Sequence, residues 1–491
     1  MTNDVKLPSD APVVYESQDS MRIYRLNRPK ALNSLNHEMI TSLRTEIKKW
    51  RQSDLCRVIV ARGDERAFCA GGDVKSLIQD LKKGDAAQNI ALPFFKDEFE
   101  LNWLLARLGK PYVSLMDGIV MGGGCGIALP APIRIATPRT HFAMPETKIG
   151  YAPDVGVNYY LAQLDGNLGA WLAITGHDLY GRAVYELGLA THYVSESALD
   201  SIVQEIQQLS NPNLTQVSNI IANHTSPVPP RSAALSSKES RDGHSPIKGE
   251  IMAFLDRAFD CETIKEIYEK LDRASNDFEL SEEVRAWARE QKTIMDARSP
   301  TGMAVALEGY RMAKNAKRLD VTLDNDMSMA TAFAGKNRST NDFVTGVSSL
   351  LIEKSRDRPH WQPNDISDPA VSPADIKAKF FDLKGEIKEH RPELDLQPPS
   401  VSEKTKGPDS TWGQFGRYGL PSQLEVMAKV EGYAPSAGAF KVTEAELIDR
   451  VLDDRGESGG PRETEMQAKV KDLVSRLCEV KEGGYLDWRR S

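Results

Sequence analysis

The sequence has no uninterrupted apolar run of about 18 residues, the length that a membrane-spanning helix requires. The nearest candidate, residues 112–136, is interrupted by Asp117, Arg134, several glycines and two prolines. We therefore expect a buried strand, a loop and a short helix there rather than a membrane span. The chain also lacks an excess of positive charge, because its formal net charge is -8, which argues against a basic face for nucleic acid.

The cysteines and histidines show no spacing that is typical of a disulfide scaffold or a metal site. The five cysteines form no CxxC pair, and their odd number favours a reduced compartment over a disulfide scaffold. The eight histidines show no HxxxH or HExxH spacing, so the sequence predicts no metal site. The N-terminus carries neither an Arg-rich amphipathic segment nor an apolar signal core, which indicates that a targeting signal is absent or has been removed.

Apolar patterning predicts an α/β domain. Residues 21–26 alternate apolar and polar side chains, as a half-buried strand does. Further apolar runs and one-sided apolar spacing alternate along the chain, which is typical of an α/β fold with crossover connections. These patterns predict strands at 58–61, 112–116 and 133–136, and helices at 37–51 and 94–108.

Composition divides the chain into four segments. Residues 12–210 carry the α/β pattern, whereas 211–250 are rich in Pro, Ser and charge, which predicts a linker or insertion. Helical patterning dominates residues 251–384. Residues 385–491 form an extension that opens with a Pro/Ser/Lys-rich break and ends in amphipathic patterns.

Two helices are predicted in this extension. Thr443 and Glu446 have the spacing of a capping box, and the apolar face that follows ends at Gly456. A second amphipathic helix is predicted from the apolar positions between Met466 and Val480, and it is expected to end at Gly483-Gly484. These helices must bury their apolar faces on the core, on another subunit or on a larger assembly, and the sequence leaves those options and a homo-oligomer open.

Two glycine-rich loops each follow a predicted strand. The first is AFCAGGD at residues 67–73, and the second is MGGGCG at residues 121–126. Glycine lets backbone approach a ligand closely, and two converging N–H groups stabilise a developing oxyanion. The second loop is not a phosphate-binding loop, because no GK[ST] follows it. Taken singly, each loop is equally well explained as a tight turn.

Two acids stand eight residues apart in the largely apolar segment FAMPETKIGYAPDVG, at Glu146 and Asp154. Carboxylates in apolar surroundings have perturbed proton affinity, which suits general acid–base catalysis. From composition alone, a helix cap at Glu146 and a turn at Asp154 are the stronger alternative.

The order and spacing of these motifs resemble the crotonase (enoyl-CoA hydratase/isomerase) superfamily. The opening LNRPKALN, at residues 26–33, resembles the first motif of that superfamily. Within it, the second glycine loop, the segment with both acids and residues 174–176 most closely resemble the 3-hydroxyisobutyryl-CoA hydrolases. The resemblance covers residues 14–383.

The resemblance implies a crotonase-like ββα spiral core, followed by a helical region and, here, the extra helical extension. It also implies a mitochondrial location and no cofactor besides the coenzyme A of an acyl-CoA substrate. The resemblance implies catalysis by Glu146 and Asp154 and an oxyanion hole at Gly72 and Gly123. It implies substrate contacts from Glu98, Gly123, Glu146 and Asp154. The implied coenzyme A-binding residues are Lys30, Ala31, Leu32, Ala70, Gly72 and Asp73. A solvated helix face is the alternative for Glu98.

Gly126 separates the activities within the superfamily. Hydratases that resemble this chain use a second glutamate at this position, and dienoyl-CoA isomerases carry an aspartate there. The hydrolase pattern combines Gly126 with Glu146 and Asp154, as found here. Without an acid at this position, addition of water across a double bond loses one of its two acid–base groups. We therefore expect a thioester hydrolase of valine catabolism that acts on 3-hydroxyisobutyryl-CoA, with an enoyl- or dienoyl-CoA hydratase/isomerase as an alternative.

Two departures favour a different class of protein. The hydrolases usually have arginines near Asp326 and after the Gly346-Val347 pair, and neither is present here. Residues past about 385 have no counterpart in the short family members. A structural crotonase-fold subunit of the small subunit of the mitochondrial ribosome is therefore a further alternative.

Residues 456–460, GESGG, match the GxSxG pattern of serine hydrolases. That pattern needs a strand before it and a helix directly after it. A charged helix precedes it here and Pro461 follows, so we expect an interhelical loop.

Overall fold

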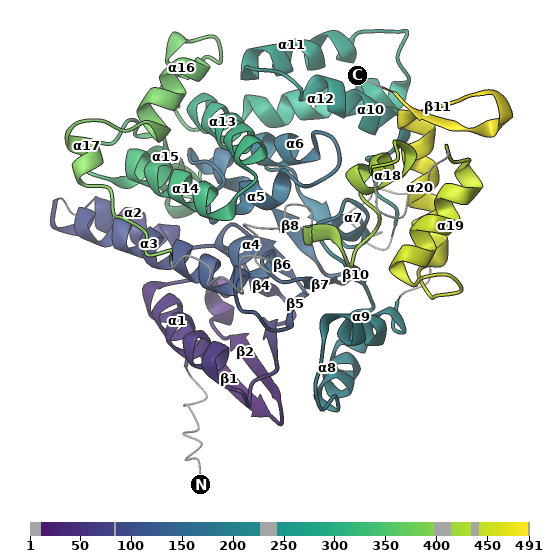
Figure 1. Cartoon of the computed structure of the whole chain (residues 1–491). Coiled ribbons are helices and arrows are strands. Elements are labelled where there is room, and N and C mark those ends of the chain that lie inside the picture. The colour runs from purple at the N-terminus through teal and green to yellow at the C-terminus, as the bar shows by residue number, and fades with distance from the viewer. Residues whose placement is uncertain (1–10, 83–84, 226–242, 397–413, 434–440, 490–491) are drawn as a thin grey trace.

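The computed structural model describes residues 11–82, 85–225, 243–396, 414–433 and 441–489 (Figure 1). Its larger sheet has six strands in the order β1-β2-β3-β5-β7-β10. β1 and β2 are antiparallel, and the remaining neighbours are parallel. The bounds are β1 (Val13–Gln18), β2 (Met21–Leu26), β3 (Val58–Arg62), β5 (Tyr112–Met116), β7 (Ile133–Ala136) and β10 (His192–Tyr193).

A second sheet has the order β4-β6-β8-β9. From β3 to β8, consecutive strands enter the larger and the smaller sheet in turn, so the chain winds as a spiral. The bounds are β4 (Ala67–Cys69), β6 (Ile119–Met121), β8 (His141–Ala143) and β9 (Leu179–Tyr180). These short strands bring the ends of both glycine loops to one place, since β4 pairs directly with β6.

Side chains of the larger sheet alternate between two apolar layers, as the pleat of a strand requires. Ile23, Val60 and Ile135 face a layer that α8 (Leu199–Gln207) and α9 (Leu214–Ala222) complete. Tyr24 and Ile59, each one residue away, belong to the main core instead. This alternation explains why strands buried on both faces read as apolar runs.

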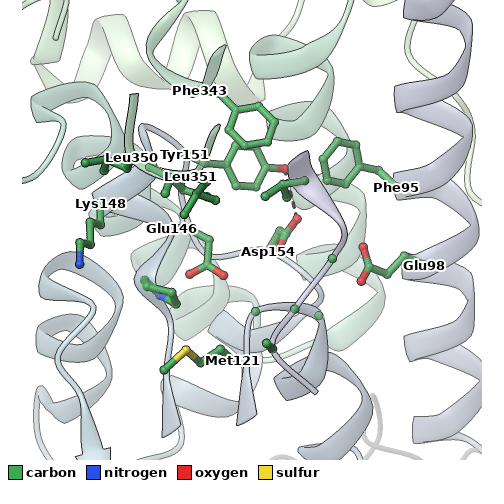
Figure 2. A pocket seen from close by; sticks show the side chains of 18 of the residues that line it. Phe95, Glu98, Met121, Glu146, Lys148, Tyr151, Asp154, Phe343, Leu350 and Leu351 are labelled. Carbon is green, nitrogen blue, oxygen red and sulfur yellow. Dashed lines mark hydrogen bonds between the residues drawn. The ribbon is translucent and has the colours of Figure 1, made fainter. Parts of the chain in front are cut away.

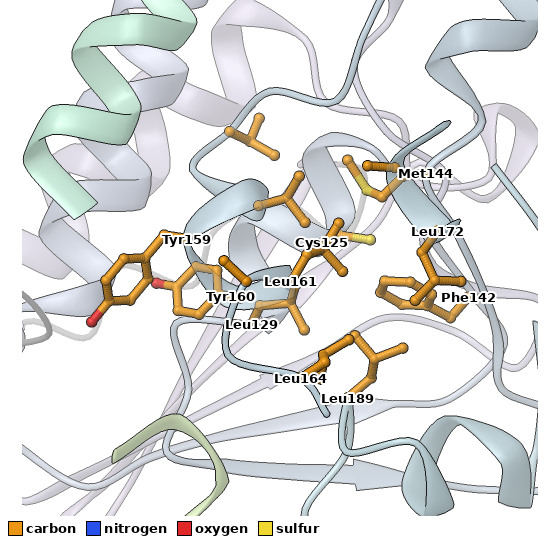
Figure 3. Packing of buried hydrophobic residues seen from close by; sticks show 14 of the residues in the cluster. Cys125, Leu129, Phe142, Met144, Tyr159, Tyr160, Leu161, Leu164, Leu172 and Leu189 are labelled. Carbon is orange, nitrogen blue, oxygen red and sulfur yellow. The ribbon is translucent and has the colours of Figure 1, made fainter. Parts of the chain in front are cut away.

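Helices α1 to α7, which belong to the N-terminal α/β part of the chain, surround the main core. α1 is capped by Asn36, whose side chain accepts a hydrogen bond from the Met39 N–H. Figure 3 shows the packing around α4 and α5, where Cys125, Phe142 and Leu161 are fully buried. The bounds are α1 (His37–Gln52), α2 (Val74–Leu81), α3 (Asp85–Ala106), α4 (Gly123–Ala128), α5 (Val157–Leu161), α6 (Leu168–Thr175) and α7 (Arg182–Glu186).

A helical region follows and packs on the spiral. α13 contacts α5 and α6, and α14 contacts α3 and α5 (Figure 1). The predicted linker, residues 211–250, contains α9, and its part 226–242 lies outside the described residues. The bounds are α10 (Gly249–Ala258), α11 (Ile264–Ser275), α12 (Glu282–Asp296), α13 (Pro300–Ala316), α14 (Leu319–Ala334), α15 (Asp342–Gly346), a π-helical turn at Val347–Ile352, α16 (Pro373–Ile376) and α17 (Glu386–Glu389).

The C-terminal extension docks on the core of its own chain. Glu465 accepts hydrogen bonds from Arg182 at 2.7 Å and from Tyr185 at 2.9 Å, and all three residues are buried. The guanidinium of Arg134 lies 3.8 Å from the ring centre of Phe415. The bounds are α18 (Gln423–Val430), α19 (Glu444–Arg455), α20 (Glu463–Leu477), β11 (Cys478–Val480) and β12 (Leu486–Trp488).

Two sequence predictions for the extension are tested by these bounds. The capping box of Thr443 and Glu446 is confirmed, whereas the second helix ends at Leu477 and not, as predicted, at Gly483-Gly484. Val480 belongs to β11 and is 65% exposed, so its match to the helical pattern was fortuitous. The GESGG segment is a loop between α19 and α20, as predicted, and Ser458 donates to Asp453 there. Among the described residues, no helix combines the length and the apolar character needed to cross a membrane.

Candidate active site

A cavity of about 570 Å³ lies between the two glycine loops, α3 and the π-helical turn. Figure 2 shows its three acids: the carboxyl group of Asp154 lies between those of Glu146 and Glu98, and aromatic rings lie beside them. The main lining residues are Ala70, Gly71, Gly72, Phe94, Phe95, Glu98, Met121, Gly122, Gly123, Glu146, Lys148, Tyr151, Asp154, Phe343, Leu350, Leu351 and Arg356.

The two predicted oxyanion-hole glycines lie side by side at one edge of this cavity. The Leu35 N–H donates to the carbonyl of Gly71 and the Asp73 N–H donates to the carbonyl of Leu35, both at 2.8 Å, so Gly72 sits between two backbone bonds. Gly123 is the first residue of α4, and a β-carbon on it would lie 3.3 Å from the nitrogen of Gly72. Neither N–H has an acceptor within the described parts of the chain. The pair can therefore donate to one anionic oxygen.

Glycine is required at the turn between β6 and α4. Gly122 has φ of 47° and ψ of -123°, a conformation open essentially to glycine alone. A β-carbon there would lie 3.0 Å from Oε1 of Glu146, and one on Gly123 would collide with Oε1 of Glu98. Both acids therefore reach directly to the backbone of the second glycine loop.

Three buried carboxyl groups face the cavity from three elements. Glu146 lies in the 3₁₀ turn Pro145–Ile149, Asp154 lies just before α5, and Glu98 lies on α3; their exposed fractions are 7%, 6% and 2%. Oε1 of Glu98 and Oε2 of Glu146 are buried without a hydrogen-bond partner among the described residues. Unpaired buried acceptors of this kind are rare in folded proteins and indicate a place for a ligand or water.

Burial changes the acidity of all three groups. It raises the pKa of Glu146 well above its ordinary value, and the charge of Asp154 adds to the effect. It likewise raises the pKa of Glu98, with further contributions from Asp154 and then Glu146. Burial raises the pKa of Asp154 to about 7, although the hydrogen bond from Tyr151 opposes the change. A pKa near neutral pH, as burial gives Asp154, suits a group that takes and releases protons in acid–base catalysis.

Aromatic side chains hold the hydroxyl that orients Asp154. The Tyr151 hydroxyl donates to Oδ2 of Asp154 at 3.2 Å. The Tyr151 ring stacks on Phe95 with centroids 5.8 Å apart and lies 4.7 Å from Phe343. Rings on two other elements pack against Tyr151 and so restrict the position of its hydroxyl.

The space around Gly126 is already filled. A β-carbon on Gly126 would lie 2.6 Å from Cβ of Val155 and 2.7 Å from Nδ2 of Asn102. No larger side chain fits in this arrangement, because real β-carbons do not approach other atoms so closely. The absence of an acid at this position is thus part of the packing of α3, α4 and the turn after Asp154.

The predicted coenzyme A residues form a second group beside the cavity. Ala70 lines it, and the Ala70 N–H donates to the carbonyl of Leu32 at 3.0 Å, which joins the two predicted binding loops. Lys30 is exposed, and Ala31 is partly buried beside it. The Asp73 carboxylate accepts hydrogen bonds from Arg28 at 3.1 Å and from the Ser76 hydroxyl. It therefore also links the first predicted binding loop to the start of α2.

Sequence reasoning missed several residues of the cavity. Tyr151, Phe95 and Phe343 come from separate segments, and nothing local in the sequence links them. Lys148 and Arg356 also line the cavity and are exposed. The lysine follows Glu146 in the same motif and could have been noted, whereas the arginine reaches the cavity only through the fold.

Comparisons with known proteins identify the family. The chain matches the enoyl-CoA hydratase/isomerase family over residues 21–380 and belongs to it. The carnitinyl-CoA dehydratase of Mycobacterium thermoresistibile is similar in structure, with a TM-score of 0.64 and 30% identity over 79% of this chain and 100% of that one. The predicted crotonase-like fold is therefore confirmed, and the chain is a member of a family of enzymes that act on coenzyme A thioesters.

Two curated relatives differ in how much of this chain they match. The rat 3-hydroxyisobutyryl-CoA hydrolase, mitochondrial, is 35% identical over 76% of this chain and 89% of its own length. The small ribosomal subunit protein mS47 of Neurospora crassa is 32% identical over 97% of this chain and 88% of its own length. The human hydrolase is also named as mitochondrial, and the predicted mitochondrial location is confirmed by these relatives.

Proposed function

We propose that the chain is a thioester hydrolase that converts 3-hydroxyisobutyryl-CoA to 3-hydroxyisobutyrate and free coenzyme A in valine catabolism. One observation carries the proposal: Glu146, Asp154 and Glu98 face the paired Gly72 and Gly123 N–H groups across one cavity, while packing excludes an acid at position 126. The 35% identity to the rat hydrolase supports the same reading.

The geometry suggests how the reaction proceeds. The thioester oxygen accepts hydrogen bonds from the Gly72 and Gly123 N–H groups, which stabilise the charge that develops when the carbonyl carbon is attacked. Glu146 either removes a proton from the attacking water or attacks directly to form an anhydride that water then opens. Either route breaks the C–S bond, adds the oxygen of water to the acyl carbon and leaves a proton for the departing thiolate. Asp154 orients the water or the substrate, and Glu98 contacts the acyl group.

The hydrolysis is tested by following release of the free coenzyme A thiol from a panel of short acyl-CoA thioesters. We expect turnover to be fastest with the 3-hydroxyisobutyryl thioester. Glu146→Ala is expected to lower kcat at least about 100-fold, because removal of a general base or nucleophile has effects of this size. Glu269→Ala, an exposed change on α11, serves as the control.

Two results would refute this proposal. A folded protein that releases no thiol from any thioester of the panel is not a hydrolase of this class. An unchanged rate for Glu146→Ala would show that Glu146 is neither the general base nor the nucleophile, even if thiol were released. Formation of a hydroxyacyl product from an enoyl-CoA would instead support the hydratase alternative, which the filled space at Gly126 disfavours.

A second function is favoured by the length of one match. The small ribosomal subunit protein mS47 of Neurospora crassa matches 97% of this chain, which includes the extension, whereas the rat hydrolase matches 76%. The chain would then be a crotonase-fold subunit of the small subunit of the mitochondrial ribosome. Sedimentation of a mitochondrial lysate through a sucrose gradient tests this: the protein co-migrates with the small subunit if it is a component, and runs only as a small free species if it is not.

A further inference from the structure

The backbone directly after Asp154 adopts a conformation that its sequence disfavours. Val155 has φ of 52° and Gly156 has φ of 73°, so two successive residues lie in the left-handed region. A β-branched residue is rare there, and a single residue held in this region costs of order 1–3 kcal/mol. The strain must be offset by contacts made by the turn itself.

One such contact comes from α14, far along the chain. The Gly156 N–H donates to Oδ2 of Asp326 at 2.7 Å, and Asp326 is 3% exposed. A β-carbon on Gly156 would lie 2.7 Å from Cδ1 of Leu319, on the same helix. α14 thus closes over the turn with a hydrogen bond and with apolar side chains.

The other side of the turn presses against α4 and α3. Val155 is 1% exposed, and its side chain occupies the space beside Gly126 and Asn102. Its left-handed backbone therefore directs the valine side chain into the core and leaves the neighbouring Asp154 facing the cavity. If the turn relaxed to an ordinary conformation, both side chains would change direction.

We infer that Asp326 is a positioning residue: by holding the Gly156 N–H it keeps the Val155–Gly156 turn left-handed and so fixes the direction of Asp154. The inference rests on the proposed hydrolase function, because it assigns Asp326 a part in that reaction without contact with the substrate. Displacing a catalytic group by about 1 Å can lower the rate about 100-fold. A residue that positions Asp154 without touching the substrate can therefore control kcat.

The chemical state of Asp326 determines which substitutions are informative. Burial, followed by the charge of Asp154, raises the pKa of Asp326 well above its ordinary value, which favours the neutral carboxyl group. A neutral carboxyl group and a carboxamide offer the same acceptor oxygen to an N–H donor. Asp326→Asn should therefore keep the contact, whereas Asp326→Ala removes it and leaves the Gly156 N–H buried without a partner.

The test compares these two variants with Thr331→Val, a change of similar volume at a buried site of the same helix. Thioester hydrolysis is measured per mole of folded protein. We expect Asp326→Ala to lower kcat about 30-fold with KM changed less than about threefold, and Asp326→Asn to stay within about threefold of the parent for both constants. Thr331→Val should resemble the parent.

A second measurement is independent of activity. Hydrogen exchange of the peptide covering residues 151–161, followed by mass spectrometry, should become about tenfold faster in Asp326→Ala and stay unchanged in Asp326→Asn. Parental kcat in Asp326→Ala, equal losses in both aspartate variants, or unchanged exchange in Asp326→Ala would each overturn the inference. If the parent protein hydrolyses no thioester, the hydrolase proposal fails and the catalytic role of Asp326 fails with it, whereas faster exchange in Asp326→Ala alone would still show that the residue holds the turn.

Discussion

Replacing Asp154 by asparagine is expected to stabilise the protein while removing its activity. In the folded protein burial raises the pKa of Asp154 to about 7, from an ordinary value of 3.8. Between these two values the folded chain binds more protons than the unfolded chain, so its stability falls as pH rises from about 4 to about 7 and stays low above that. At pH 8 the ionisation of this one group therefore lowers the free energy of unfolding by at most about 4 kcal/mol.

Asparagine removes this ionisation and can still accept the hydrogen bond from Tyr151. At pH 5 the ionisation of Asp154 lowers the stability of the parent protein by only part of its full amount. The gain in free energy of unfolding from asparagine should therefore grow by about 2–3 kcal/mol between pH 5 and pH 8. Urea unfolding followed by tryptophan fluorescence at both pH values measures this difference. Asp154→Asn should in addition lower thioester hydrolysis at least about 100-fold.

Asp117→Asn is the matched control for this measurement. Asp117 is also buried, but it accepts a hydrogen bond from Arg139 at 3.0 Å and one from the Thr137 hydroxyl at 2.6 Å. Loss of that ion pair should destabilise the protein at both pH values. The reasoning is refuted if Asp154→Asn is less stable than the parent at pH 8, or if its gain is the same at pH 5 and pH 8.

Three further substitutions test the packing of the site and of the extension. Gly126→Glu should cost about 3 kcal/mol or more in urea unfolding and should not create hydratase activity, because Val155 already fills that space; a stable variant that hydrates enoyl-CoA would contradict this. Glu465→Ala should lower the free energy of unfolding by about 3–5 kcal/mol, since it removes the carboxylate that pairs with the buried Arg182, and an unchanged urea midpoint would show that this ion pair does not stabilise the fold. Gly123→Ala should retain its circular dichroism spectrum but lose at least about 100-fold in hydrolysis, because the new methyl group would collide with Oε1 of Glu98 and lie 3.3 Å from the Gly72 nitrogen, beside the predicted oxyanion hole.

Much of the larger sheet could be predicted from local pattern. The ranges predicted for β2, β5 and β7 agree with the structure, because β2 alternates apolar and polar side chains and β5 and β7 are short, largely apolar runs. The four strands of the smaller sheet were not predicted as strands, since each has only two or three residues and offers no period to detect. α3 begins at Asp85, well before the predicted residue 94, with Pro93 inside the helix.

The candidate site was predictable only where its residues lie in motifs. Glu146, Asp154 and both glycines belong to short segments whose order is informative, and the structure brings them together. Asp326 was noticed only as a departure from the family, because its contact with Gly156 joins residues 170 positions apart. The meaning of Gly126 also changed: the sequence showed a missing acid, and the fold shows that Val155 and Asn102 leave no room for one.

The buried ion pair between Arg182 and Glu465 has a consequence for how the protein is oriented within any larger particle. Apolar contacts are non-directional, whereas a buried ion pair is favourable only when its two partners meet in good geometry. The extension is therefore fixed on the core in a single orientation, supported by the hydrogen bond from Arg134 to the Phe415 carbonyl at 2.9 Å. A partner that bound the extension would therefore also set the direction in which the cavity of the candidate site opens.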